Sequence, residues 1–399
     1  MRLKILFGLP LLALALPFPA FAQTELQFRQ CNGPNPALAI IGCTVIINES
    51  RNTQAIRSGA FANRGNAYAT RGQLDRAIAD FDAAIRLDDG NSAALVGRGN
   101  YYQLQGDSDR AIADFNRAVA ANPRDSAAFS QRGNFYLIAG EPERAIPDYD
   151  RAIAIDSKNV AALANRGEAY RVQGETDRAI ADFDAAIRVD PRFLAAYLNR
   201  GLAVMDKGEF DRAIGEFDQA LRLDPKSVAA YNNRAVAHES QGAHDRALAD
   251  FAEAIKLDPN DPATYVNRGN IFQNQSDFDR AVEDYSHAIM LAPDFADAYA
   301  NRGTVHARRN DYTRAMADYD QAIRLDPGRG DAYANRGLAL VKAGQFARAM
   351  ADFDKAIASD PKDALSLYNR GVAKQNLGDR LGGDIDVINA RAIDPNVGR

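Results

Sequence analysis

Hydrophobic side chains recur at a helical period over most of the chain, in pairs of short segments. In residues 330–363, side chains from Tyr333 to Leu340 share one face at i, i+3, i+4 and i+7 spacing, and a second set begins at Ala349. Gly344 lies between the two sets, at a place where a helix would end. The pattern therefore predicts two helices joined by a tight turn, which is a helical hairpin.

The hairpin pattern repeats with a fixed period of 34 residues. The triplet Asn-Arg-Gly marks this period, because every spacing between its copies is a multiple of 34. The triplet begins at Asn63, Asn165, Asn199, Asn267, Asn301, Asn335 and Asn369, and variants of it begin at Gly97, Gln131 and Asn233. Ten copies run without insertion or deletion from Ser58 to Val397. Such self-similarity is typical of proteins in which each unit packs on its neighbours.

The unit resembles the tetratricopeptide repeat, whose pattern asks for a small residue at position 8, Ala at 20, an aromatic residue at 24 and Pro at 32. When Ser58 is counted as position 1, position 20 is Ala in nine units and position 24 is aromatic in the same nine. The aromatic residues are Phe81, Phe115, Tyr149, Phe183, Phe217, Phe251, Tyr285, Tyr319 and Phe353. The resemblance implies an all-α fold, a right-handed superhelix (α-solenoid) of ten helical hairpins.

Residues 24–57 continue the same phase imperfectly, and we interpret them as a degenerate N-terminal capping repeat. The predicted organisation is a signal peptide at 1–22, a capping half-repeat at 23–57, and ten repeats over 58–397, at 58–91, 92–125, 126–159, 160–193, 194–227, 228–261, 262–295, 296–329, 330–363 and 364–397.

Two repeats depart from the pattern within their second helix. Pro147 predicts a weak or bent third repeat, because proline removes a backbone donor. Gly382 and Gly383 make the second helix of the tenth repeat a poor helix former, and Val387 replaces its aromatic residue. We therefore expect the tenth repeat to be a terminal cap.

The first residues have the features of an export signal. Arg2 and Lys4 precede an apolar stretch, and Ala20 and Ala22 supply the small residues that signal peptidase requires. A membrane anchor is the alternative, but it needs about 20 apolar residues and this stretch is shorter. We expect the protein to be exported to the periplasm, with secretion as the alternative, and the mature chain to have no membrane span.

Composition limits the partners and cofactors. The chain has 48 Lys and Arg against 53 Asp and Glu, so it lacks the basic excess of a nucleic-acid-binding protein. Two cysteines and four histidines leave little material for a metal site of several ligands. His238 and His306 replace an aromatic residue at position 11, and we interpret them as core residues rather than a metal pair. We expect neither a metal nor another cofactor.

The two cysteines lie in the capping segment. Exported chains pass through an oxidising compartment, so we predict a disulfide between Cys31 and Cys43. Two buried free thiols are the first alternative. A redox-active pair is the second, although the spacing is not that of a CxxC motif.

Arginine and an acidic residue recur together in every repeat. Position 7 is Arg64, Arg98, Arg132, Arg166, Arg200, Arg234, Arg268, Arg302, Arg336 and Arg370. Position 23 is Asp80, Asp114, Asp148, Asp182, Glu216, Asp250, Asp284, Asp318, Asp352 and Asp386. Position 7 lies on the side of the first helix that packs on neighbours, so an unpaired guanidinium there would be costly. We predict arginine–carboxylate contacts, several of them bidentate; independent, exposed residues are the alternative.

Asparagine dominates position 6, which in this family faces the concave groove. It occurs as Asn63, Asn165, Asn199, Asn233, Asn267, Asn301, Asn335 and Asn369. An amide offers donors and an acceptor that match an extended peptide backbone of any sequence. The row resembles the asparagine-lined superhelices of the family, which bind peptides in this way. The alternative is that these side chains bond within the helix or to a neighbouring helix.

Catalysis would require a constellation that breaks the repeat symmetry, and the carboxylates instead recur in phase. The chain is therefore expected not to be an enzyme and to have no catalytic residues. Two hypotheses follow. The first is an exported scaffold that binds a protein or an extended peptide in its groove. The second is an envelope-assembly component that acts in polysaccharide export or outer-membrane biogenesis.

Overall fold

The computed structural model describes residues 20–398. Its 22 helices are α1 (Ala20–Cys31), α2 (Pro36–Asn48), α3 (Gln54–Thr70), α4 (Leu74–Leu87), α5 (Ser92–Leu104), α6 (Ser108–Ala121), α7 (Ser126–Ile138), α8 (Pro142–Ile155), α9 (Val160–Val172), α10 (Thr176–Val189), α11 (Leu194–Asp206), α12 (Phe210–Leu223), α13 (Val228–Ser240), α14 (His244–Leu257), α15 (Pro262–Asn274), α16 (Phe278–Leu291), α17 (Ala296–Arg308), α18 (Tyr312–Leu325), α19 (Gly330–Lys342), α20 (Phe346–Ser359), α21 (Ala364–Asn376) and α22 (Arg380–Ile393). The described residues contain no strand, which confirms the all-α prediction.

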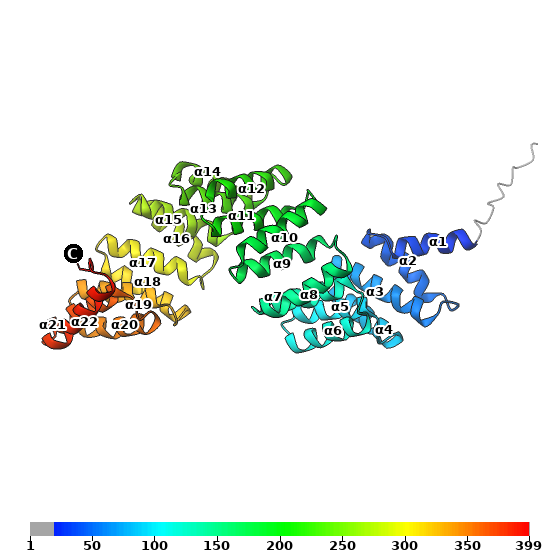
Figure 1. The fold of residues 1–399 in the computed structure, drawn as a ribbon, viewed down its shortest axis with the longest axis horizontal. Coiled ribbons are helices and arrows are strands. Elements are labelled where there is room, and N and C mark those ends of the chain that lie inside the picture. The colour runs from blue at the N-terminus through cyan, green and yellow to red at the C-terminus, as the bar shows by residue number, and fades with distance from the viewer. Residues whose placement is uncertain (1–19, 399) are drawn as a thin grey trace, which may run out of the picture. The chain divides into compact units, whose positions relative to one another are not determined.

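Two compact units divide the chain, at residues 1–196 and 197–399. Within each unit, consecutive helices lie against one another as hairpins, such as α3 with α4 and α19 with α20 (Figure 1). None of the helices in residues 20–398 is both long enough and apolar enough to cross a membrane. The predicted signal peptide, residues 1–22, lies outside the described residues except for its last three.

The turn inside each hairpin depends on a left-handed backbone conformation at position 15. Gly72 ends the first helix of its hairpin with a φ of 71°. Glycine adopts this conformation without a steric cost. Ser276 and Asn310 occupy the same place in two later hairpins, with φ of 62° and 60°. Repeats seven and eight therefore keep the turn even though they lack its glycine.

In nine of the ten repeats, the core of the hairpin is an aromatic ring packed against small residues. In the hairpin of α9 and α10, Phe183 and Ala179 are fully buried. A Cβ atom added to Gly167 would lie only 2.7 Å from a carbon of the Phe183 ring. Small residues at positions 8 and 20 thus leave the space that the ring at position 24 fills, which explains why these positions vary so little.

The predicted arginine–carboxylate contacts are present in all ten repeats. Nine of the arginines donate Nε and Nη2 to the two oxygens of the aspartate sixteen residues later. The tenth, Arg200, donates Nη2 to Glu216 at 2.6 Å. We call this set of contacts the Arg–acid ladder. The alternative, independent solvent-exposed residues, is therefore wrong.

Most ladder arginines also reach back to the preceding hairpin. Arg98 binds Asp114 of its own hairpin at 2.7 and 2.9 Å, and its Nη1 donates to Asp82 at 2.8 Å. Six further arginines repeat the contact sixteen residues back, to Asn116, Asp150, Asp218, Ser286, Asp320 and Asp354. The same guanidinium thus joins the two helices of one hairpin and fixes that hairpin against the one before it.

The pKa values of nine of the ladder arginines are raised above their ordinary value. For Arg98 the main cause is the hydrogen bond to Asp114, which outweighs the opposing effect of burial, and the hydrogen bond to Asp82 adds to it. The side chains of Arg98 and Asp114 are only 17% and 5% exposed. A charge buried to this extent is costly unless it is paired, so the loss of either partner should lower the free energy of unfolding substantially.

The predicted disulfide joins Cys31 at the end of α1 to Cys43 in α2, with an S–S distance of 2.07 Å. Both cysteines are buried, and Ile46 and Phe28 pack beside them. The first described helical pair is therefore closed covalently as well as by apolar contacts.

Two helices, α8 and α22, contain residues that depart from the repeat pattern, and neither helix is interrupted. Helix α8 continues through Pro147, whose exposed position lets water satisfy the carbonyl group that loses its donor. Helix α22 has its full 14 residues. Gly383 faces the backbone of Gly371, and a Cβ there would lie 2.7 Å from the Gly371 oxygen. The glycines of the tenth repeat thus permit close helix packing, and α22 forms a complete helix although glycine is a poor helix former.

His238 and His306 lie in the core, as the sequence predicts. Nε2 of His238 lies 4.0 Å from the ladder residue Asp250, and Nε2 of His306 lies 3.9 Å from Asp318. The pKa of each imidazole is lowered, mainly by burial, and Asp250 or Asp318 opposes this only in part. No group of three His, Cys, Asp or Glu side chains within residues 20–398 is arranged to hold a metal ion.

Replacing one ladder aspartate should destabilise the fold much more than replacing a residue of the preceding hairpin. We expect Asp114→Ala to cost about 2–3 kcal/mol, because it leaves a buried guanidinium without its main partner. Asp82→Ala is the matched control and should cost about 0–1 kcal/mol, because Asp82 is more exposed. Denaturant unfolding measures both changes. Equal losses in the two variants would contradict the assignment of Asp114 as the main partner.

The buried histidines should make the fold sensitive to mild acid. Their pKa is lower in the folded chain, so the unfolded chain binds more protons and stability falls as the pH drops through about 6.5. In the double variant His238→Phe/His306→Phe, each histidine is replaced by the residue that Phe272 provides at the same repeat position. Between about pH 7 and pH 5, the melting temperature of this variant should fall less than that of the unmodified protein. The His287→Phe variant serves as the control. A loss equal to that of the unmodified protein would contradict the prediction.

Candidate functional site

The position 6 asparagines lie one to a helix on the first helices of their hairpins. All eight are half-buried, and their helices are α3, α9, α11, α13, α15, α17, α19 and α21. Their hydrogen bonds divide them into two groups. The structure therefore separates residues that the sequence pattern treats alike.

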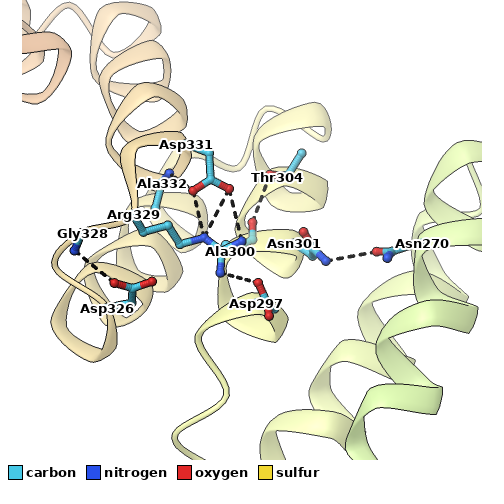
Figure 2. Close-up of polar contacts among 10 residues, drawn as sticks. All are labelled: Asn270, Asp297, Ala300, Asn301, Thr304, Asp326, Gly328, Arg329, Asp331 and Ala332. Atoms are coloured by element: carbon cyan, nitrogen blue, oxygen red, sulfur yellow. Dashed lines mark hydrogen bonds and ion pairs between the residues drawn. The ribbon is translucent and has the colours of Figure 1, made fainter. Parts of the chain in front are cut away.

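Three of the eight amides are bound to the preceding hairpin. Asn165 donates to Oδ1 of Asn134 at 2.7 Å, and Asn301 donates to Oδ1 of Asn270 at 3.0 Å (Figure 2). Asn63 donates in the same way to Asn32 of the capping segment, at 2.7 Å. In each case the acceptor lies thirty-one residues earlier, at position 9 of the preceding unit. These three side chains hold neighbouring hairpins together.

The same acceptors satisfy buried tyrosines. Tyr149 donates its hydroxyl to Asn134 at 2.8 Å, and Tyr285 donates to Asn270 at 2.7 Å. Tyr319 donates to the hydroxyl of Thr304 at 3.2 Å. Burial is the main cause that raises the pKa of Tyr319 to about 12. A tyrosine at position 24 thus uses a polar partner at position 9 of its own hairpin, whereas a phenylalanine needs none.

Sequence reasoning missed this pairing. The signal was present, because each of the three tyrosines at position 24 follows an Asn or Thr fifteen residues earlier. Asn66 and Asn100 precede phenylalanines, however, so the reverse rule does not hold. Position 9 is therefore partly structural and partly available to a ligand.

The remaining position 6 amides are not used by neighbouring hairpins. Asn369 donates to the Leu365 carbonyl of its own helix. The side chains of Asn199, Asn233, Asn267 and Asn335 make no hydrogen bond to any residue in 20–398, and none of their polar atoms is sealed from solvent. For Asn233 and Asn267 the cause is clear, because Leu202 and Val236 stand at the place of the acceptor.

Three of the unused amides lie on consecutive first helices of the second unit. We call Asn199, Asn233 and Asn267, on α11, α13 and α15, the amide row. Each amide keeps two donors and one acceptor for a ligand. The row is uncharged, so it offers hydrogen bonds without selecting for ligand charge.

Ion pairs of one arginine join two further first helices of the second unit. Arg329 donates to Asp331 at 2.9 Å and to Asp297 (Figure 2). Both aspartates occupy position 2, at the beginning of α19 and α17. The Arg329 side chain is only 18% exposed. Neither α17 nor α19 has a side-chain hydrogen bond at its N-cap, and these ion pairs connect the beginnings of the two helices instead.

The first unit presents different chemistry on its first helices. Leu104, Ile138 and Val172 end α5, α7 and α9, and they are 72%, 75% and 55% exposed. The other seven repeats carry a polar or charged residue at this position: Thr70, Asp206, Ser240, Asn274, Arg308, Lys342 and Asn376. We call the three apolar residues the apolar edge. Sequence reasoning missed it, although comparison of the repeats would have shown it.

An uncharged cavity lies where the capping segment meets the first repeat. Its volume is about 290 Å³. The side chains of Asn32, Asn63, Asn66 and Thr70 contribute to its lining, and the disulfide residue Cys31 lies at its wall. Amides and a hydroxyl group suit a neutral ligand that carries many hydrogen-bonding groups.

Comparison with known proteins places this geometry in a family. The tetratricopeptide repeat profile matches residues 62–126, 96–160, 164–227, 198–262 and 266–330, and a second profile of the same repeat matches 303–368. No curated protein sequence matches the chain.

Solved structures agree on the fold. A tetratricopeptide repeat protein from Parabacteroides merdae is 23% identical, with a TM-score of 0.53 over 62% of this chain and 98% of that one. Yeast Tom70 is 15% identical, with a TM-score of 0.51 over 94% of this chain and 92% of that one. A chain of the Cut9–Hcn1 hetero-tetramer of the APC/C is 16% identical, with a TM-score of 0.54 over 89% of this chain and 69% of that one. The family profiles cover more than half of the chain, which therefore belongs to the tetratricopeptide repeat family.

Proposed function

We propose that the protein is an exported, non-catalytic scaffold that binds a protein or an extended peptide along the first helices of its hairpins. Repeat scaffolds of this family typically mediate protein–protein interaction. The observation that carries the proposal is the amide row, in which three consecutive hairpins present amides that no described residue uses. Their regular spacing suits a ligand that offers a backbone group to each hairpin in turn.

Two observations support export. The disulfide between Cys31 and Cys43 is of a kind that forms and persists in oxidising compartments. The N-terminal sequence has the basic start, the apolar stretch and the small residues of a cleaved signal. The periplasm is the proposed location, and secretion is the alternative.

The second candidate function is envelope assembly with a glycan ligand. The uncharged cavity beside the capping segment favours it, because amide and hydroxyl groups suit a sugar as well as a peptide. Binding of the unmodified protein to a glycan array but not to a randomised peptide library would favour this candidate. The opposite result would favour peptide binding.

The amide row should recognise a backbone rather than particular side chains. We expect the best binder from a randomised peptide library to lose most of its affinity when its backbone amides are N-methylated, because each lost neutral hydrogen bond costs about 1 kcal/mol. Scrambling its sequence should matter less. Isothermal titration calorimetry measures both effects, and strong dependence on sequence with none on methylation would contradict backbone recognition.

Replacing the unused and the bound amides should have opposite consequences. The variant Asn199→Ala/Asn233→Ala/Asn267→Ala should bind the same peptide about tenfold to a hundredfold more weakly with little change in melting temperature. The matched variant Asn63→Ala/Asn165→Ala/Asn301→Ala should melt at a lower temperature, because it removes three hydrogen bonds between neighbouring hairpins. Unchanged affinity in the first variant would reject the site.

A further inference from the structure

Helix α22 presents an apolar face that the corresponding helices of the other repeats lack. Leu381, Ile385 and Ile388 occupy positions 18, 22 and 25 and are 75%, 49% and 66% exposed. No Leu, Ile or Val occurs at these positions in the other nine repeats. Position 18 is Asp75, Asp109, Glu143, Asp177, Asp211, Asp245, Asp279, Thr313 and Ala347; position 25 is Asp82, Asn116, Asp150, Asp184, Asp218, Ala252, Ser286, Asp320 and Asp354.

Ile388 also ends the Arg–acid ladder. At position 25 most repeats carry the side chain that accepts Nη1 of the arginine in the next hairpin, as Asp354 does for Arg370 at 2.8 Å. An isoleucine cannot accept a hydrogen bond, so Ile388 offers no acceptor of this kind on the outer face of α22. Together with its exposed apolar side chains, this suits the outer face of α22 to a different contact.

Charged residues beside the apolar face indicate what that contact is. Asp384 and Arg391 are exposed and lie seven residues apart, about 10.5 Å along the helix, on either side of Ile388. Arg391 has no ion pair with any residue in 20–398. Asp384 accepts one hydrogen bond, from Gln375 at 2.8 Å. One acid and one base on either side of an apolar residue form a self-complementary pattern.

We propose that α22 is the interface through which a second copy of this chain binds, as an antiparallel pair of α22 helices. A two-fold axis beside Ile388 places Asp384 of each copy opposite Arg391 of the other, because an isologous contact between two residues occurs twice. The same register brings Leu381 of one copy towards Ile393 of the other, which is 43% exposed. The interface thus has an apolar centre at Ile385 and Ile388, an ion pair on each side of it, and a further apolar contact beyond each ion pair.

Helix α2 is the competing surface. Leu38, Ile41 and Val45 are exposed there by 44%, 57% and 37%. Helix α2 contains no charged residue, however, so nothing in it favours one register or one partner. The charges of α22 supply that preference, and α2 enters the test as the alternative.

Charge exchange tests the pairing with the full chain. Sedimentation equilibrium should show a dimer for the unmodified protein at concentrations up to about 100 µM. Asp384→Arg alone and Arg391→Asp alone should each raise the dissociation constant at least about tenfold, because each places like charges together. An equimolar mixture of the two variants should form a heterodimer, and the double exchange should restore the homodimer. Asp75→Arg, the same charge change on α4, is the control.

A cross-link supplies a second readout that does not depend on affinity. Both native cysteines are in the disulfide. Ile388→Cys should therefore form a covalent dimer on mild oxidation, whereas Ile138→Cys, at a position that is 75% exposed, should not. Circular dichroism confirms that the variants remain folded.

Three results would overturn the proposal. The first is an unmodified protein that stays monomeric over the whole concentration range. The second is a dimer that survives both single charge exchanges. The third is a dimer that is lost in Ile41→Asp but kept in both α22 variants, which would assign the interface to α2.

Discussion

The contact between a guanidinium and two carboxylates is the interaction on which the rest of this structure depends. Each ladder arginine is held by the second helix of its own hairpin, and most also reach the hairpin before it. Arginine can do this because its five donors project in fixed directions. The contact sets both the pairing of helices within a hairpin and the register between hairpins.

The ladder leaves much of the first-helix surface free for other roles. Its charges point into the packed layer, so the position 6 and position 13 residues are not needed to pair them. Where the preceding hairpin offers an amide acceptor at position 9, the asparagine at position 6 binds it. Where that residue is Leu202 or Val236, the amides of Asn233 and Asn267 remain unused, and together with Asn199 they form the amide row.

The sequence was sufficient for features that recur in every repeat. The helical hairpin, the packing of Phe183 on Ala179 and the pairing of Arg98 with Asp114 all follow from a spacing that the chain repeats. The disulfide followed from the predicted export to an oxidising compartment and from the location of both cysteines in the capping segment. The division of the asparagines did not follow, because it depends on a neighbour thirty-one residues away in another hairpin. The close packing of Gly383 on Gly371 did not follow either, because helix propensity takes no account of such contacts.

The central claim is that the Arg–acid ladder fixes the hairpins while the amide row binds a peptide backbone. The most direct measurement is NMR of the side-chain amide groups of the asparagines during titration with a bound peptide. The account predicts that the resonances of Asn199, Asn233 and Asn267 shift as the site fills, while those of Asn165 and Asn301 stay in place. Shifts confined to Asn165 and Asn301, or absent from all five, would contradict it.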